Sequence, residues 1–295
     1  MNKSGCKRGN GATLWLEQIL RPSLRHIKSE RILMFIDTHC HLDADEFSGT
    51  QNALVHEAAS VNVNVIVIPS VSRSNFATVQ TLSAHYPGCL PAYGIHPMYV
   101  DQAVPEDLDV LREYLQAGRP FAVGEIGLDF FVENFNREAQ EIYFVAQLKL
   151  ARQFELPVLL HVRKAQDTVL KHLRQHKVRG GIAHAFNGSP QQAAEFIKLG
   201  FKLGFGGAMT YPRATKLREL ARTLPLDSIV LETDAPDMPP AFLSRGQPNR
   251  PSYLPRIAET LAELRQIPVA EIARITSANA RTVLPALAAQ NEIPS

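Results

Sequence analysis

FIDTHCHLD, residues 35–43, begins as an apolar run and ends in acids and imidazoles. Side chains alternate along a strand, so Asp37, His39 and His41 would share one face. Cys40 would point to the opposite face, which argues against it as a nucleophile. Two imidazoles on one face are typical of a metal site, although a strand end also holds hydrogen-bonded histidines. This stretch alone leaves both interpretations open.

Short apolar runs rich in β-branched residues continue from this stretch and alternate with helical patterns. We expect strands at 34–39, 64–69, 90–95, 120–125, 157–161, 181–184, 201–205 and 229–233. Eight strand–helix units over about 250 residues are typical of a TIM barrel. An open doubly wound sheet is the alternative, but no GxGxxG turn follows the first strand. The prediction is therefore an α/β fold, a single-domain (β/α)8 TIM barrel.

The barrel domain is expected to cover residues 34–285, followed by a C-terminal tail at 286–295. Residues 1–33 lack a core periodicity, and Met34 stands directly before the first strand. We expect residues 1–33 to be an N-terminal extension that is disordered or reflects a misassigned start. A basic targeting peptide is the alternative, although Pro22 interrupts the helix that such a peptide needs.

Charge is distributed unevenly along the 295 residues, whose formal net charge is +2. Residues 1–33 hold seven Lys or Arg and two Glu, which leaves 24 basic and 27 acidic residues in the remainder. The folded part therefore has no general attraction to phosphate, and a nucleic-acid partner must be argued from a local site. Three cysteines without a CxxC pair, and no apolar run of about 20 residues, favour a cytoplasmic protein without a membrane span.

Reactive side chains lie at the C-terminal ends of the expected strands. They are His39, His41, His96, Glu125, His161, His184 and Asp234. Each alone could be a capping group or a hydrogen-bonded core residue. Parallel strands of a barrel bring their C-terminal ends to one rim, where barrel enzymes carry out their chemistry. So many coincidences at one rim predict a metal centre.

Four imidazoles and two carboxylates exceed what one tetrahedral ion with an open position needs. We therefore predict two divalent ions bridged by Glu125, one held by His39, His41 and Asp234 and the other by His161 and His184. A divalent ion lowers the pKa of bound water from 15.7 to about 7, which provides hydroxide at neutral pH. Asp234 and Glu125 are the predicted catalytic residues, with Asp234 managing the proton. Imidazoles favour Zn²⁺ and the carboxylates permit Mg²⁺ or Mn²⁺, so the metal stays open.

Seven motifs carry a family resemblance. They are IDTHCHLD, YGIHP, GEIGLDF, LPVLLHVRKA, AHAFNGS, LETDAP and NRPSYLP, in this order between Met34 and Leu284. This pattern resembles the TatD family of metal-dependent hydrolases. The resemblance implies a TIM barrel with a divalent-metal centre and deoxyribonuclease activity that includes 3′ to 5′ exonuclease action. The family's ligand positions fall on the six metal-binding candidates named above.

Two positions depart from the commoner family pattern. Met98 stands where His is frequent, and Ala183 stands where Cys is frequent. Neither change removes a metal ligand. The departures bring the sequence nearer to the YjjV-type branch of the family, and Met98 removes one possible substrate contact.

Two residues are predicted to contact substrate. His96 would bind a phosphate or hydrogen-bond to a metal ligand, and Arg163 would bind phosphate through two N–H groups. Either could instead be structural, Arg163 through a salt bridge at the rim. Asp129 could orient the loop after Glu125.

The predicted function is a metal-dependent phosphodiesterase, a deoxyribonuclease that acts as a monomer on DNA or another phosphodiester. The alternative is an ester or amide hydrolase acting on a small metabolite or an aminoacyl-tRNA ester. A binding protein with a structural metal is a third interpretation, which a barrel rim with this many ligands disfavours.

Overall fold

The computed structural model describes residue 1 and residues 34–117 and 120–289. The chain divides into two units, Met1–Leu33 and Met34–Ser295. The expectation for the N-terminal extension falls on residues 2–33, which lie outside the described residues. All that follows concerns the second unit.

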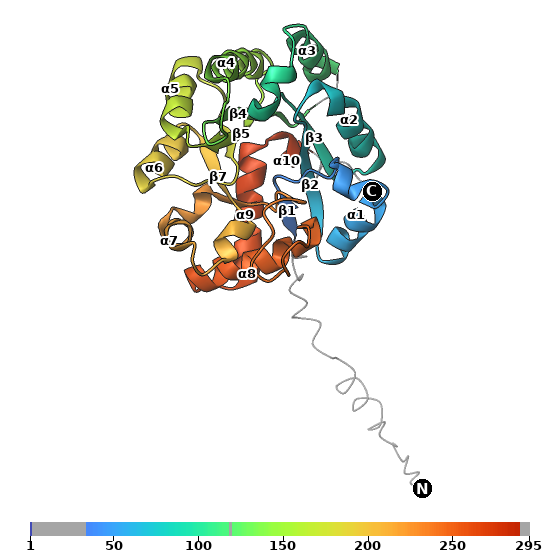
Figure 1. Ribbon diagram of the computed structural model, residues 1–295. Helices are drawn as coiled ribbons and strands as arrows, with labels where there is room; N and C mark the ends of the chain where they lie inside the picture. Colours follow the sequence, from blue (N-terminus) through green and yellow to red (C-terminus); the bar gives the residue numbers. More distant parts are fainter. Residues whose placement is uncertain (2–33, 118–119, 290–295) are drawn as a thin grey trace. The chain divides into compact units, whose positions relative to one another are not determined.

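Eight parallel strands form one sheet in chain order (Figure 1). They are β1 (Phe35–Asp37), β2 (Val63–Pro69), β3 (Cys89–Tyr93), β4 (Ala122–Asp129), β5 (Val158–Arg163), β6 (Gly181–Ala183), β7 (Phe201–Phe205) and β8 (Ile229–Leu231). Thr38 connects the first strand to the last, because its amide nitrogen and its Oγ1 both donate to the Leu231 carbonyl, at 3.1 and 3.0 Å. The TIM barrel is thereby confirmed and the doubly wound sheet excluded.

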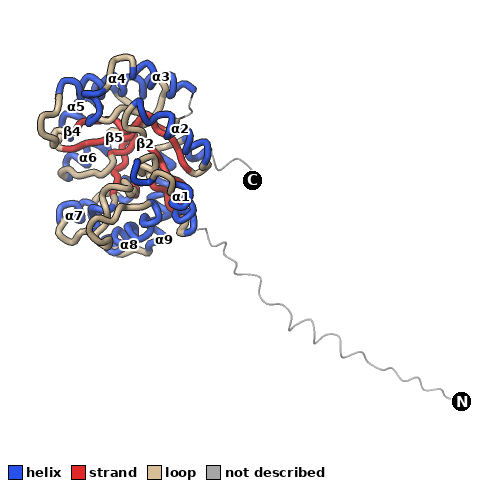
Figure 2. Tube along the Cα trace, turned by 45° about the vertical axis from the view of Figure 1, so that its right-hand side comes forward, coloured by secondary structure: helices blue, strands red, loops and turns tan. Residues whose placement is uncertain are grey.

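Helices surround the strands, and each of the first eight follows the strand of the same number (Figures 1 and 2). They are α1 (Gln51–Ser60), α2 (Phe76–His85), α3 (Asp107–Ala117), α4 (Arg137–Gln153), α5 (Gln166–His176), α6 (Pro190–Lys198), α7 (Thr215–Thr223) and α8 (Leu254–Arg265). Two more, α9 (Val269–Val283) and α10 (Ala286–Ala289), end the described chain. Among the helices described, none is long and apolar enough to cross a bilayer.

Local sequence determines where these helices begin. At α6, Ser189 Oγ accepts a hydrogen bond from the Gln192 amide at 3.1 Å, and Gln192 Oε1 accepts one from the Ser189 amide at 2.9 Å. Pro190 occupies the first helical position, where a missing N–H costs nothing. This capping box satisfies two amides that a helix start would otherwise leave unpaired, so α6 begins directly after the rim residue His184 and its short loop.

The strands end at other residues than the sequence predicts where side-chain hydrogen bonds replace the backbone hydrogen bonds between strands. β1 and β8 each stop two residues early, at Asp37 and Leu231. Beyond them, Asp37 accepts hydrogen bonds from the Thr233 amide at 2.9 Å and from the Thr233 hydroxyl at 2.5 Å. β4 is longer than expected, because it continues to pair with β5 as far as Asp129 opposite Arg163.

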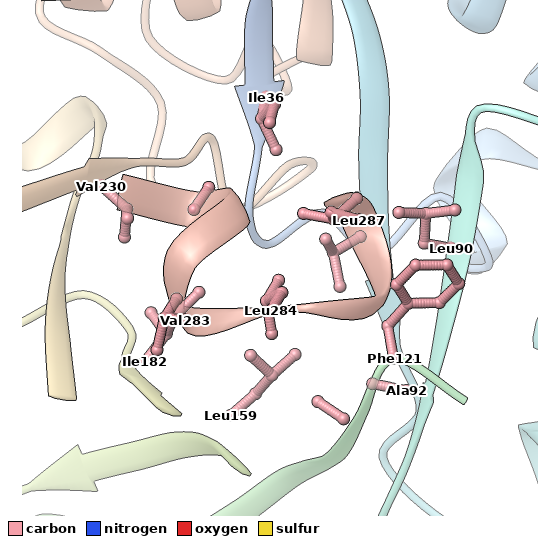
Figure 3. Close-up of a cluster of buried hydrophobic side chains, with 13 residues drawn as sticks. Ile36, Leu90, Ala92, Phe121, Leu159, Ile182, Val230, Val283, Leu284 and Leu287 are labelled. Atoms are coloured by element: carbon pink, nitrogen blue, oxygen red, sulfur yellow. The ribbon is translucent and has the colours of Figure 1, made fainter. Parts of the chain in front are cut away.

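An apolar cluster closes the N-terminal end of the barrel (Figure 3). Side chains from seven strands and from Phe121, directly before β4, meet Leu284 and Leu287 of the C-terminal segment. The sequence places residues 286–289 in a tail, but they form α10, and Leu287 is buried in this cluster. The reason is hydrophobic: a single turn of helix puts Leu287 against the open end of the barrel.

Candidate metal centre

Two histidines leave the end of β1 with their rings converging. The Nε2 atoms of His39 and His41 lie 3.3 Å apart, and His39 is fully buried. Burial and the charge of the neighbouring His184 lower the pKa of His39 to about 3. For His41, burial favours the neutral ring, but the hydrogen bond and charge of Glu125 raise the pKa to about 9. The pair therefore aims two nitrogens at one point, with one ring held neutral.

Glu125, on β4, lies among the imidazoles with its two oxygens facing different strands. Oε2 lies 3.2 Å from His39 Nε2 and 3.5 Å from His41 Nε2; Oε1 lies 3.0 Å from His161 Nδ1, 3.2 Å from His184 Nε2 and 3.5 Å from His96 Nε2. Burial alone would raise the pKa of Glu125, but the surrounding imidazoles hold it well below its usual range. One buried carboxylate, fully ionised, is thus shared by five rings.

Asp234 follows β8 and completes the first side of the centre. Its Oδ1 lies 3.7 Å from His39 Nε2 and 3.8 Å from His41 Nε2, and its amide donates to the His39 carbonyl at 2.8 Å. Its φ of 58° lies in the left-handed region, which costs about 1–3 kcal/mol in a residue other than glycine. Burial raises the pKa of Asp234 to about 6. The surrounding contacts therefore impose a strained backbone that turns this carboxylate toward the histidines.

Three groups of side chains in the described part of the chain could each hold a metal ion. They are His39, His41 and Glu125; His39, His184 and Asp234; and His96, Glu125 and His161. The donors are nitrogens and carboxylate oxygens, the set that Zn²⁺ and other divalent ions use. His39 and His184 each turn Nε2 toward the Glu125 carboxylate, at 3.2 Å. The donor set therefore fits one or more divalent ions.

The grouping differs from the predicted partition in two respects. His184, predicted to share an ion with His161, lies with His39 and Asp234; the His39 and His184 rings stack at 3.9 Å. His96, predicted to contact substrate, lies in the group of Glu125 and His161. All six predicted ligands meet at the rim, and their assignment to particular ions stays a prediction.

Asp129 determines how His161 presents its nitrogens. Asp129 Oδ2 lies 3.0 Å from His161 Nε2, on the side of the ring opposite Glu125. A carboxylate only accepts, so both ring nitrogens of His161 donate here, and both hydrogen bonds raise the pKa of the ring. An ion bound beside Glu125 would take the place of the Nδ1 hydrogen, while Asp129 keeps the hydrogen on Nε2. The sequence places Asp129 in a loop after Glu125, but it ends β4 and contacts His161 directly.

Glu232 plays the same part behind His184, and the sequence analysis missed it. Its Oε1 lies 3.5 Å from His184 Nδ1 and accepts a hydrogen bond from the Ala185 amide at 2.5 Å. Its carboxyl group fills the space beside Gly204, where a Cβ would collide with it. The motif LETD contains the signal, because residues 232 and 234 share a face by strand alternation.

His96 is oriented by its own backbone. The Met98 amide donates to His96 Nδ1 at 3.2 Å, so a neutral ring carries its hydrogen on Nε2. That nitrogen faces Glu125 Oε1 at 3.5 Å. Burial lowers the pKa of His96 to about 4. The ring is therefore a neutral hydrogen-bond donor beside the centre, which suits a substrate contact better than a metal ligand.

Arg163 ends β5 in an exposed position and makes no ion pair in the described chain. Its guanidinium carbon lies 3.8 Å from the centroid of the Phe131 ring. Its side chain lines a cavity of about 760 Å³ that also contains His161, His184 and Asp234. The described chain shows no rim salt bridge for Arg163, and its contact to substrate stays a prediction.

Cys40 and Asp37 lie outside the three metal groups. Cys40 is fully buried, and burial together with the charge of Asp37 raises the pKa of its thiol well above the usual range. Its rejection as a nucleophile is confirmed. Asp37, predicted on the face of His39 and His41, instead binds Thr233 and the His39 amide, and burial raises its pKa to about 7.

Comparisons with known proteins agree with this fold and this site. The family model for TatD related DNase matches residues 36–285. The metal-dependent hydrolase YjjV of Escherichia coli (strain K12) is 43% identical over 255 residues, 85% of this chain and 98% of the relative. The crystal structure of Escherichia coli YjjV matches with a TM-score of 0.82 over the same shares of the two chains. The Klebsiella pneumoniae protein named 3′-5′ ssDNA/RNA exonuclease TatD is 31% identical over 255 residues, 84% of this chain and 96% of its own length.

A barrel with imidazoles and carboxylates converging at its C-terminal rim defines a metal-dependent hydrolase. The chain belongs to the TatD family, and its similarity to YjjV confirms the YjjV-type branch. A TatD family hydrolase of Entamoeba histolytica, 19% identical with a TM-score of 0.77 over 85% of this chain and 98% of its own, shares the fold.

Proposed function

We propose that the chain hydrolyses phosphodiester bonds of DNA, removing nucleotides from the 3′ end, with two divalent ions held at the barrel rim. The observation that carries this proposal is the position of Glu125. Its ionised carboxylate faces His39 and His41 with one oxygen, and His161 and His184 with the other. A carboxylate with both oxygens committed to nitrogen donors of different strands suits a ligand shared by two ions. Both the family's DNase description and the exonuclease name of the Klebsiella relative support DNA as the substrate.

The chain's own residues have separate roles in this reaction. Divalent ions held by these residues would lower the pKa of water to about 7 and so supply the attacking hydroxide. Asp234, at the same rim, would accept the proton that the attacking water releases. His96 donates from Nε2 to a phosphate oxygen, and Arg163 offsets the charge that develops on phosphorus oxygens. Asp129 and Glu232 keep the rings of His161 and His184 in the orientation that metal binding needs.

The test is metal-reconstituted activity on a single-stranded oligonucleotide labelled at its 5′ end, beside a simple carboxylic ester. We expect a ladder of products shortened one nucleotide at a time by the native chain, and none with Glu125→Gln. Intact DNA together with metal-dependent cleavage of the ester would contradict the proposal and favour the predicted alternative, an ester hydrolase with the same centre.

Arg163→Ala separates the two reactions further. Without the guanidinium, we expect DNA cleavage to fall by about 10-fold or more, because a charge-assisted contact to phosphate is worth about 1.5–3 kcal/mol. Ester cleavage would be unchanged if the ester does not reach the β5 end of the rim. Equal losses on both substrates would contradict a phosphate-binding role for Arg163.

A further inference from the structure

Two cavities flank the metal centre and differ in charge. One, of about 720 Å³, extends from the centre toward the loops after β1, β2 and β3; the other, of about 760 Å³, extends toward β5 and β6. Both are lined by His161, His184, Asp234 and the exposed Asp237, so they meet at the metal centre and share one carboxylate beside it. A chain crossing the centre would lie in both at once.

The first cavity, here named the acidic cavity, is lined by Asp43, Asp45 and Glu46 from the loop after β1. Asp45 and Glu46 are exposed and make no ion pair in the described part of the chain. No Lys or Arg among the described residues lines this cavity. Met98 and Tyr99, both exposed, give it an apolar flank. Its lining therefore suits an uncharged group with hydroxyls and a flat apolar part, and opposes a phosphate.

Asp43 supplies the most specific feature of the acidic cavity. Its side chain is only 6% exposed, and its Oδ2 accepts from Asn75 Nδ2 at 2.5 Å. Its Oδ1 is buried without a hydrogen-bond partner, 3.9 Å from His41 Nδ1. This buried acceptor has no partner in the described chain, so a donor brought against it by a ligand in the cavity would stabilise it.

The second cavity, here named the basic cavity, is lined by Arg163, Lys164 and Phe131. The Phe131 ring holds both cations, with the Arg163 guanidinium carbon at 3.8 Å and Lys164 Nζ at 4.6 Å from its centroid. Neighbouring residues of a strand point to opposite faces, but Lys164 has a φ of 52°, which breaks that alternation. Two cations thus stand on one aromatic ring at the edge of the same cavity.

We infer that the difference in charge between the two cavities makes the centre selective for the 3′ end of a nucleic acid strand. The inference rests on the proposed function. The acidic cavity takes the 3′-terminal nucleoside, whose 3′-hydroxyl donates to Asp43 Oδ1 and whose base lies against Met98 and Tyr99. The basic cavity binds the phosphates upstream through Arg163 and Lys164. Water adds to the phosphorus, the bond from phosphorus to the upstream O3′ breaks, and that oxygen takes a proton. The products are a strand shortened by one residue and a nucleoside 5′-phosphate.

The arrangement selects ends by repulsion. A strand that continued past the terminal nucleoside would place another phosphate beside Asp43, Asp45 and Glu46, where the described lining holds no Lys or Arg. Like-charge juxtaposition of this kind costs several kcal/mol. A 3′-phosphate tests the same repulsion without lengthening the strand.

The experiment compares kcat/KM for oligonucleotides of one sequence that end in a 3′-hydroxyl or in a 3′-phosphate. For the native chain we expect a preference of at least about 10-fold for the hydroxyl end. Asp45→Asn with Glu46→Gln should reduce that preference at least about threefold by removing two charges. The matched control is Glu113→Gln with Asp227→Asn, which removes two exposed charges that line neither cavity and should keep the native preference.

A 2′,3′-dideoxy end tests Asp43 without altering the protein. Loss of the 3′-hydroxyl should lower kcat/KM by about 10- to 100-fold in the native chain, the value of one hydrogen bond to a charged group. Asp43→Ala should cleave both ends at equal rates. In the basic cavity, Arg163→Ala with Lys164→Ala should abolish the fall in KM that the native chain shows as upstream nucleotides are added.

The outcomes separate this inference from the proposed function. Failure to cleave any of these strands would overturn the proposed function. Cleavage of DNA with equal rates on 3′-hydroxyl and 3′-phosphate ends, or a preference that Asp45→Asn with Glu46→Gln leaves unchanged, would overturn the inference and leave the phosphodiesterase standing.

Discussion

The two ends of the barrel are built from the same strands and have opposite character. At the N-terminal end, Leu284 and Leu287 fill the opening with apolar side chains (Figure 3). At the C-terminal end, one carboxylate is enclosed by five imidazoles, and burial shifts the pKa of His39 to about 3. Apolar burial contributes about 25 cal/mol per Å² to the free energy of folding. The apolar N-terminal end therefore offsets the free energy that burying charged and polar groups costs at the C-terminal end.

The cost at the C-terminal end is visible in its unpaired atoms. Buried side-chain atoms without a hydrogen-bond partner include His39 Nδ1, His184 Nδ1, Glu232 Oε2 and Asp43 Oδ1, all at or beside the centre. Each such group costs about 1–3 kcal/mol. Apolar burial elsewhere in the barrel offsets this cost.

Glu125→Gln should abolish activity at the C-terminal end of the barrel and leave the apolar N-terminal end intact. We expect kcat/KM to fall by about 10³-fold or more, about 4 kcal/mol, because the amide cannot bind two ions as an anion does. Activity assays on reconstituted protein give the loss, and circular dichroism checks the fold. Activity within 10-fold of the native chain, a loss of less than about 1.4 kcal/mol, would contradict a central role for Glu125.

Leu284→Ala should destabilise the N-terminal end of the barrel and leave the metal centre intact. Leu284 is fully buried among strand side chains, so truncation should lower the free energy of unfolding by about 2–5 kcal/mol. Urea unfolding measures that change, and kcat below the transition should stay native. A large loss of kcat in the folded variant would mean that the two ends are coupled.

Asp129→Asn should weaken the centre by less than the Glu125 change. Without the carboxylate, His161 loses the charged acceptor that fixes its ring at 3.0 Å, and metal affinity should fall by about 10- to 100-fold. Isothermal titration with Mn²⁺ measures the affinity. Rescue by Asp129→Glu would not be expected, since the longer side chain displaces the oxygen, and unchanged affinity in Asp129→Asn would assign Asp129 to strand pairing alone.

Glu232→Gln should have the smallest of these effects. The contact to His184 Nδ1 is longer, at 3.5 Å, and the amide oxygen of glutamine can still accept from the Ala185 amide. We expect metal affinity to fall by about 10-fold, the low end for a group behind a metal ligand. The same titration measures it, with Asp227→Asn as the control for a lost surface charge.

The sequence predicts the C-terminal end well because parallel strands collect their ends. Each histidine after a strand, from His39 to His184, reaches the rim through strand geometry alone, and no long-range contact is needed to foresee it. Asp234 follows the same rule at the eighth strand. The order of the motifs along the chain predicts the barrel for the same reason, because each motif ends one strand.

What the sequence could not predict depends on departures from regular strands. β4 shifts its register between Val123 and Ile126, which carries Asp129 to His161. Lys164 joins Arg163 only because its backbone turns to a positive φ. Leu287 is buried because an open barrel end lies beside it, which periodicity over four helical residues cannot reveal.

The most direct test of the central claim is electron paramagnetic resonance of the metal-free chain titrated with Mn²⁺. We expect two ions per chain and an exchange-coupled spectrum, because Glu125 would join them, and we expect Glu125→Gln to lose the coupling. One ion per chain, or two ions with uncoupled spectra, would contradict a centre organised around a shared Glu125.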